Sequence, residues 1–450
     1  MVTLFYISLS VLIAAALGSG GLLLVLCIEN RRFWKNRQQQ VAPSEQRPAK
    51  VNLIIPCKGR SENSRATLEA FFFQNHPNFR ITFAVESPTD PVVPLIRELQ
   101  KEHRYVESSM VFAGAAKTCG QKVHNLLAAI DRLDQNIDII AFADMDALVK
   151  PSWLRWLVVG VGRQGCGART GYRWMVPQRQ NLPTLLGVSL NNSIAACLGK
   201  ATHRLVWGGS WAIHRNVFQQ IGIGSSWSQV LSDDLAASRA IRSSKFDGKP
   251  LRIQFEPQCL CETEASFNWS SLFEFVVRQL KITRLYAFSH WSLALLTSAV
   301  TQVAFWGSVA TWIAVMYSGD RGLLPTLLMF SFIFIYVLGV ARGSMRQNMA
   351  RRLFPKWRSQ RKARNFDIFA WPITGLFALL SLVMSSLGNR VSWSNVHYQV
   401  ESGGRTMIIG RNIETEAWPV RTNQSVPKPK MAAIVNAPSR SAGSSVEQSV

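Results

Sequence analysis

The chain has 450 residues, 48% of them hydrophobic and 17% charged, and its formal net charge is +23. Its basic residues crowd beside apolar runs and form no single stripe, so anionic lipid headgroups explain them better than nucleic acid, which we exclude as a partner. Seven scattered cysteines exclude a disulfide framework, and we expect reduced thiols in a cytoplasmic main domain.

Residues 1–30 are expected to form an N-terminal transmembrane anchor. The stretch 4–27 carries no charge and is long enough to span a bilayer, and it lacks the basic start of a secretory signal. Basic residues follow it directly, which places the downstream side in the cytoplasm. Residues 31–50 then form a linker, so the chain is predicted to be an integral membrane protein.

Apolar segments of two kinds alternate over residues 51–266. Short apolar runs predict buried strands, and the amphipathic stretches between them predict helices. The expected strands are 51–56, 81–85, 106–112 and 139–143, and the expected helices are one carrying Leu68, Phe71 and Phe72, then 92–103 and 117–133. This order predicts an α/β domain with a mainly parallel sheet and helices on both faces, in which ligands bind beyond the carboxyl ends of the strands.

Two carboxylates follow the run 139–143, whose continuous apolar sequence indicates a buried strand. Alternate residues of an extended chain point the same way, so Asp144 and Asp146 can face one space. Two oxygen ligands at a strand end suit a hard divalent cation that holds phosphate. A loop with two solvated acids is the more frequent outcome for a bare D-x-D pair, and only the motifs that accompany the pair favour a site.

Two later segments have a structural and a functional interpretation. The glycines and aromatic residues of 207–211 allow either a close backbone approach or a tight turn. Ser232, followed by two aspartates, is on its own an ordinary helix start, with serine as the N-cap.

The C-terminal part is expected to lie at and in the membrane. Residues 267–290 are rich in aromatic residues with interspersed Arg and Lys, which predicts an interfacial amphipathic helix. The region 291–388 follows as a transmembrane region with a basic cytoplasmic loop, 342–364, that holds nine Lys or Arg and no acid. Its apolar runs are 293–317, 323–341 and 368–387.

The side of the membrane on which the tail 389–450 lies stays open. Four alternating crossings would put the tail outside, whereas its own basic residues favour the inside. In the second case the run 368–387, which contains Pro372, re-enters the membrane instead of crossing it. From about residue 422 the composition is typical of a disordered segment.

The order of these motifs over residues 51–286 resembles that of membrane-bound, inverting family-two glycosyltransferases, in particular the ceramide glucosyltransferase-like branch. The matching positions are Pro56 at the end of the first strand, Glu86 with Asp90 for the nucleotide-binding acid, Lys122 and Asn125 in the K-x-x-N element, Asp144 and Asp146 in the metal-binding D-x-D, Gly208, Gly209 and Ser210 on the acceptor side, and Asp233 with Asp234 for the acid pair of the catalytic base. Residues 390–400 also resemble a short motif that this branch carries after its last membrane segment.

One signature of the family departs from its usual form. The Q/R-x-x-R-W of the interfacial helix reads Arg278-Gln279-Leu280-Lys281-Ile282, with lysine in place of arginine and no tryptophan. Lys281 keeps the positive charge but loses the bidentate geometry of an arginine.

The resemblance implies a GT-A-type fold, the nucleotide-diphospho-sugar transferase fold, and a cytoplasmic catalytic domain. It implies transfer of a hexose, most simply glucose, from a UDP-sugar to a lipid hydroxyl with inversion, and ceramide, diacylglycerol and hopanoid-type lipids all stay open as acceptors. Mg²⁺ or Mn²⁺ on Asp144 and Asp146, together with Arg278 or Lys281, would neutralise the leaving diphosphate. Asp234 would deprotonate the acceptor.

Two other functions stay open. A processive polysaccharide synthase uses the same scaffold, but it usually has an intact Q-x-x-R-W and more transmembrane helices than this chain offers. A degenerate, non-catalytic transferase-like membrane protein is favoured only by the altered signature, whereas Asp144, Asp146 and Asp234 argue against it. The oligomeric state and the choice between Glu86 and Asp90 as nucleotide ligand also stay open.

Overall fold

The structure is a computed structural model, which describes residues 2–41, 47–163, 165–200, 205–319, 321–354, 357, 359–401 and 403–412. The described helices and strands all belong to Met1–Arg411, the first of two units into which the chain divides. The segment from about residue 422, predicted to be disordered, lies outside the described residues.

A seven-stranded sheet in the order β3-β2-β1-β4-β6-β5-β9 forms the centre of this unit. Its strands are β1 (Val51–Cys57), β2 (Phe79–Val85), β3 (Ser108–Phe112), β4 (Ile139–Ala143), β5 (Cys166–Pro177), β6 (Ser210–His214) and β9 (Arg252–Ala265). Only β6 runs antiparallel to its neighbours, and the other strand pairs are parallel. The mainly parallel α/β sheet predicted from the alternating segments is confirmed.

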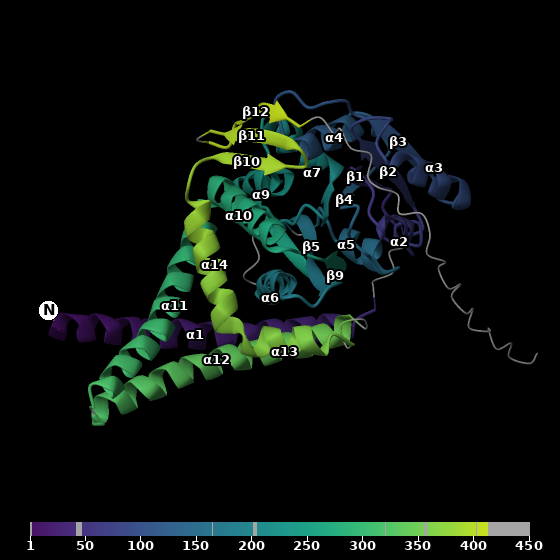
Figure 1. Cartoon of the computed structure of the whole chain (residues 1–450). Helices are drawn as coiled ribbons and strands as arrows, with labels where there is room; N and C mark the ends of the chain where they lie inside the picture. The colour runs from purple at the N-terminus through teal and green to yellow at the C-terminus, as the bar shows by residue number, and fades with distance from the viewer. Residues whose placement is uncertain are drawn as a thin grey trace, which may run out of the picture. The chain divides into compact units, whose positions relative to one another are not determined.

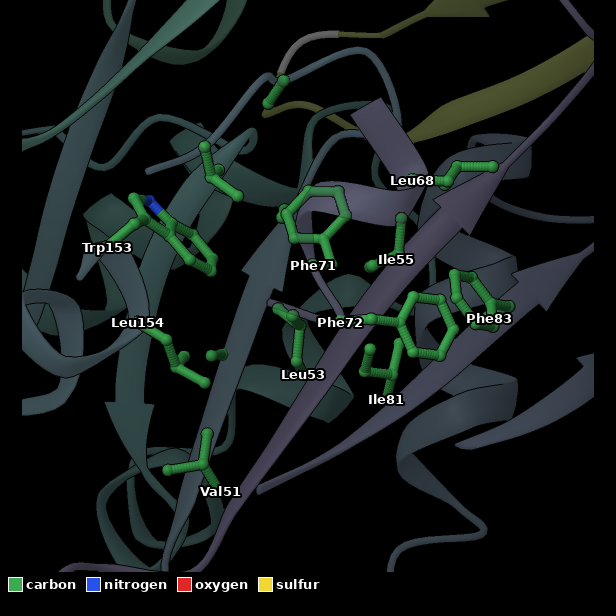
Figure 2. Close-up of a cluster of buried hydrophobic side chains, with 14 of the residues drawn as sticks. Val51, Leu53, Ile55, Leu68, Phe71, Phe72, Ile81, Phe83, Trp153 and Leu154 are labelled. Carbon is green, nitrogen blue, oxygen red and sulfur yellow. The ribbon is translucent and has the colours of Figure 1, made fainter. Parts of the chain in front are cut away.

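Helices cover both faces of the sheet, which explains why its strands are apolar throughout. Along β1, Leu53 and Ile55 pack into one hydrophobic core, whereas Ile54 packs into the opposite one. The first core contains residues of α2 (Ser64–Ala70), α3 (Val93–Glu102) and α5 (Trp153–Val158), and the second contains residues of α4 (Gln121–Ile130), α7 (Arg215–Gln220), α8 (Ile223–Trp227) and α9 (Asp233–Ser243). Figure 2 shows the first core, with side chains of β1, α2 and β2 pointing toward one another.

Some predicted boundaries move by a few residues. The helix predicted to carry Phe71 and Phe72 ends at Ala70, and both side chains enter the core from the turn that follows (Figure 2). The helix predicted over 117–133 is shorter, because Gly120 is extended and α4 begins only at Gln121.

Within the described residues, three helices are long and apolar enough to cross a membrane: α1 (Val2–Gln38), α11 (Phe288–Tyr317) and α12 (Leu323–Leu353). A fourth apolar segment is broken into α13 (Arg361–Phe369) and α14 (Trp371–Ser385), which are bent by 73°. Pro372 stands in the first turn of α14, where a residue without an N–H group is tolerated.

The basic stretch 342–364 is largely helical. α12 continues through it to Leu353, and α13 begins at Arg361. The predicted linker also begins as a helix, because α1 continues to Gln38. The cytoplasmic location of both stretches stays a prediction.

The C-terminal end of α1 is bound to the main domain by hydrogen bonds and an ion pair. Asn30 Nδ2 donates to Ala196 O at 3.2 Å, at the end of α6 (Leu182–Ala196), and Trp34 Nε1 donates to Leu198 O at 2.9 Å. Further along α1, Arg37 pairs with Glu256 of β9, whose side chain is buried. The helix α1 is therefore held against the sheet domain by direct contacts.

A three-stranded antiparallel sheet follows α14 and consists of β10 (Arg390–Trp393), β11 (Val396–Val400) and β12 (Thr406–Arg411). It lies beside α9 and α10 (Trp269–Tyr286), as Figure 1 shows. Lys58 Nζ donates to Ser394 O at 2.9 Å, and Tyr286 Oη donates to Gly404 O at 2.7 Å. The first part of the predicted tail is thus folded onto the sheet domain. A short hairpin of β7 (Lys245–Phe246) and β8 (Lys249–Pro250) completes the strands described.

All seven cysteines lie in the described residues, and none of them is joined to another in a disulfide bond. Burial raises the pKa of the Cys57, Cys259 and Cys261 thiols, so these groups stay protonated and act as small apolar side chains.

Candidate active site

Asp144 and Asp146 follow β4, and both line one large cavity. Desolvation inside the cavity, together with the charge of Asp144, raises the pKa of Asp146, while Arg173 on β5 opposes this shift. A second carboxylate so close to the first is costly to ionise without a cation. The pair therefore has the charge and the oxygen donors of a cation site.

Lys122, near the start of α4, connects this pair to a second pair of acids. Its Nζ lies 2.7 Å from Asp144 Oδ1 and 3.5 Å from Asp233 Oδ1. Burial acts to lower the pKa of Lys122, but Asp144, Asp233 and Asp234 together raise it above its usual value. The ammonium group is thus held charged between the two pairs.

The second pair stands in the first turn of α9. Ser232 Oγ accepts from Leu235 N at 3.3 Å, so the predicted N-cap is confirmed. The carboxylate of Asp234 has its own contacts in the same place: Oδ1 accepts from Leu235 N at 2.8 Å, and Oδ2 accepts from Gly208 N at 3.0 Å. Because Asp234 also lines the cavity, the helix start coincides with the position predicted for the catalytic base, whose role stays a prediction.

Asp233 is more deeply placed than Asp234. Its side chain is buried, and its Oδ2 has no hydrogen-bond partner among the described residues. Burial raises the pKa of Asp233 to about 7, an effect that Lys122 opposes and the neighbouring carboxylates increase. Asp233 therefore serves best as the inner partner of Lys122.

Two glycines let the loop before β6 approach these acids. A Cβ atom on Gly208 would lie 2.8 Å from Lys122 Nζ and 2.9 Å from Asp233 Oδ2. A Cβ on Gly209 would lie 2.6 Å from Asp144 Oδ2. The close backbone approach suggested by the sequence is thus a feature of this loop.

Other predicted site residues differ in their exposure to the cavity. Pro56, Asn125 and Arg278 line it, as do Lys122, Gly208 and the four aspartates. Ser210 instead is fully buried, where its Oγ accepts from Trp153 Nε1 at 2.9 Å. Its contact is therefore with the core below the loop.

The predicted nucleotide-binding acids lie behind the cavity wall. Glu86 Oε1 is 2.8 Å from Arg411 Nη1 and Glu86 Oε2 is 3.5 Å from Lys58 Nζ, whereas Asp90 Oδ1 accepts from Gly59 N and Val92 N at 2.9 Å. Neither acid is among the described lining residues, although Lys58 and Gly59 are. Each acid thus holds a wall segment in position, and a direct nucleotide contact stays a prediction.

Lys281 also points away from the cavity. Its Nζ donates to Arg390 O of the small sheet at 3.3 Å, and Lys281 is not among the described lining residues. Arg278, one turn earlier on α10, does line the cavity, and its Nε is buried without a hydrogen-bond partner among the described residues. Of the two cations predicted for the diphosphate, Arg278 is the one exposed to the site.

Arg173 is a cation of the site that the motifs did not indicate. Its guanidinium carbon lies 5.0 Å from the ring centroid of Phe275 and 5.9 Å from that of Trp207, and its Nε donates to Asn191 Oδ1 at 3.0 Å. Arg278 lies over the same Phe275 ring at 5.7 Å. Two arginines thus share one aromatic ring at the cavity wall.

The cavity itself extends well beyond the acids. Its volume is about 1320 Å³, and it continues from the ends of β1 and β4 into the apolar helices. Leu23 of α1, Trp291 of α11, Gly339 of α12 and Leu382 of α14 line that distant part. Trp393 of β10 is also among the lining residues.

The polar end fits a divalent cation. Asp144 and Asp146 offer hard oxygen ligands. Desolvation and the charge of Asp144 raise the pKa of Asp146, and a bound cation would reverse this shift. Elsewhere in the described part, Glu69, Glu102 and His103 also lie close enough to share an ion. That cluster already holds Arg65, at 2.6 Å from Glu102, and does not line the cavity.

Comparisons with known proteins agree with the motif order. The family model described as glycosyl transferase family 21 matches residues 19–406. Ceramide glucosyltransferase 1 of Caenorhabditis elegans is 30% identical over 79 residues, which are 18% of this chain and 17% of that protein, and ceramide glucosyltransferase 3 of the same organism is 25% identical over an equally short stretch. The chain therefore matches under a fifth of the length of these curated relatives.

Two solved structures show lower sequence similarity over more of the chain. The mannosyltransferase PcManGT from Pyrobaculum calidifontis, in complex with GDP-Man and Mn²⁺, is 15% identical, with a TM-score of 0.43 over 83% of this chain and 99% of that one. The glucosyl-3-phosphoglycerate synthase from Mycobacterium tuberculosis, in complex with Mn²⁺, UDP and phosphoglyceric acid, is 12% identical, with a TM-score of 0.32 over 52% of this chain and 78% of that one.

Proposed function

The chain belongs to glycosyl transferase family 21 and is therefore a glycosyltransferase, and from this premise we propose that it moves a hexose, glucose in the first instance, from a UDP-sugar to a membrane lipid hydroxyl with inversion. The observation that carries the lipid acceptor is the cavity. One continuous space joins the aspartates of the sheet domain to side chains of three candidate membrane helices. A lipid can place its chains among the apolar helices while its hydroxyl reaches the acids.

The donor is assigned to the polar end of the cavity. There Asp144 and Asp146 would hold Mg²⁺ or Mn²⁺, which supplies charge to the leaving diphosphate. Lys122 fixes Asp144 by its contact of 2.7 Å, and Arg278 offers its cation to the same phosphates. The nucleotide then extends toward Pro56 and Asn125, with Glu86 and Asp90 supporting the wall behind it.

The acceptor hydroxyl is assigned to Asp234. Its carboxylate is fixed by the backbone N–H groups of Gly208 and Leu235, so it does not have to reorganise when it accepts the proton. A single in-line displacement requires one base and no covalent nucleophile, and it inverts the anomeric centre.

The test uses the purified full chain in vesicles with Mn²⁺ and radiolabelled UDP-glucose or UDP-galactose. Ceramide, diacylglycerol and a hopanoid alcohol are supplied one at a time, and the label in the lipid extract is measured. We expect one acceptor to become labelled with an inverted, β-configured linkage. Label that appears only in a polymer, or in no lipid from either donor, would contradict the proposal.

A matched pair of variants tests whether turnover depends on the candidate active site. Asp144→Asn should remove the labelled lipid, whereas Asp131→Asn makes the same change on an exposed residue and should leave it intact.

A further inference from the structure

Arg342 of α12 lines the same cavity where α1, α6 and α12 meet. Its side chain is half-buried, and it has no hydrogen bond or ion pair to any other described residue. The ionisable groups near it are the thiols of Cys27 and Cys197 and the guanidinium of Arg346, and none of these is a carboxylate. A cation thus faces the cavity without a counter-ion from the described chain.

Arg346, the next arginine on the same helix, is a buried cation that does have a counter-ion. Arg346 is buried, and its Nε and Nη2 each lie 2.8 Å from a carboxylate oxygen of Asp367. Ser189 Oγ donates to the same carboxylate at 2.7 Å. The charge of Arg346 is therefore balanced by Asp367, whereas no described residue balances the charge of Arg342. Removing an arginine from water without a partner is unfavourable, so the position favours an anionic ligand.

The depth of Arg342 indicates the kind of ligand. The apolar run of α12 ends at Ala341, immediately before it, and the apolar run of α1 ends just after Cys27. Both candidate membrane helices thus change from apolar to polar at the level of this guanidinium, where lipid headgroups lie. The cavity also opens here, because Ile194 and Cys197 at the end of α6 line it and are exposed.

We propose that Arg342 binds the phosphate of an anionic membrane phospholipid in this opening. The planar guanidinium can donate two parallel hydrogen bonds to a phosphate, and the acyl chains can lie against Leu23 and Ile194. This binding needs neither donor nor metal, so it can be measured whether or not the chain turns over a UDP-sugar.

The experiment measures lipid binding to the full chain in a neutral detergent by native mass spectrometry. The probes are phosphatidylglycerol, phosphatidylcholine and inorganic phosphate. The variants are Arg342→Gln, Arg342→Lys and, as a control, Arg352→Gln, which removes one charge from the exposed end of the same helix. We expect wild type and R352Q to bind one phosphatidylglycerol with similar affinity, and R342Q to bind it at least about tenfold more weakly. R342K should lie between them, and it serves as the second variant if R342Q does not fold.

Three results would overturn the proposal: R342Q that binds phosphatidylglycerol like wild type, an equal loss in R352Q, or equal binding of phosphatidylcholine. Inorganic phosphate distinguishes the two sources of the anion. Millimolar phosphate should leave the lipid bound, and displacement of the lipid from wild type would assign the arginine to free phosphate instead.

Discussion

Replacing Asp234 by Asn separates its proposed catalytic role from its place in the first turn of α9. The carboxylate accepts three hydrogen bonds, from Gly208 N, Leu235 N and Ser232 Oγ. An asparagine has one side-chain oxygen, so D234N keeps an acceptor on one side and loses the bond from Gly208 N, at a cost of about 1–2 kcal/mol in stability. Ser232→Ala is the matched control, because it removes the N-cap at a similar cost of about 1 kcal/mol but leaves the carboxylate in place.

The two variants should therefore melt at similar temperatures and differ in turnover. Loss of the general base should slow D234N by roughly 10²–10⁴-fold, whereas S232A should keep most of its rate. UDP titration should give similar affinities for both, since the proposed contact of Asp234 is with the acceptor and not with the nucleotide. The assay pairs a melting curve and a UDP titration with the glycolipid assay above. Equal turnover of D234N and S232A would refute the assignment of Asp234 as the base.

Asp144→Asn and Asp146→Asn should each weaken Mn²⁺ binding, measured by electron paramagnetic resonance, by at least about 10²-fold, and full turnover in EDTA would exclude the metal role. Arg411→Met should lower both the melting temperature and the UDP affinity, because it removes the partner of Glu86; the loss should be about 1 kcal/mol, since both side chains are partly exposed, and unchanged values would contradict it. Burial lowers the pKa of His214 in the folded state, although the charge of Asp138 opposes this shift. The contribution of neutral His214 to the stability of the fold is therefore complete above a pH of about 6.5, and it is lost as the pH falls through the lower pKa of the folded state. His214→Asn keeps an acceptor for the cap of α7 but does not titrate, so melting curves should show a smaller loss of stability from pH 7 to pH 5 than in wild type.

The sequence predicted those features of the fold and the site that depend on residues close together in the chain. The buried strand β4 and the carboxylates at its end follow from a few consecutive positions, and the N-cap Ser232 follows from three. Features that depend on distant pairing could not be predicted in this way. Arg173 enters the site only because β5 pairs with β9 and faces Phe275 of α10, which no local pattern indicates.

The position of Lys281 likewise depends on an element that is distant in the sequence. Its spacing from Arg278 favours a phosphate contact, yet the small sheet, more than 100 residues further along, offers Arg390 O as its acceptor. The altered signature on α10 is thus accompanied by a second element against the same helix, and Trp393 of that element lines the cavity. Whether a helix residue faces the ligand depends on what packs on the helix, and the sequence of the helix does not contain that information.

The small sheet also limits the number of times that the candidate membrane helices can cross a bilayer. Its last strand contributes Arg411, which pairs with Glu86 of the main domain, so β10, β11 and β12 lie on the same side of a membrane as the candidate active site. Between α10 and β10 the number of crossings must therefore be even. If the candidate membrane helices α11 and α12 both cross, they supply two crossings, so we expect the bent pair α13–α14 to leave the bilayer on the face by which it entered, and its 73° bend is compatible with such a re-entrant loop. A cysteine introduced at residue 401 and one introduced near residue 360 should accordingly react with an impermeant maleimide from the same side of the membrane. Labelling from opposite sides would show that the number of membrane crossings between α10 and β10 is odd.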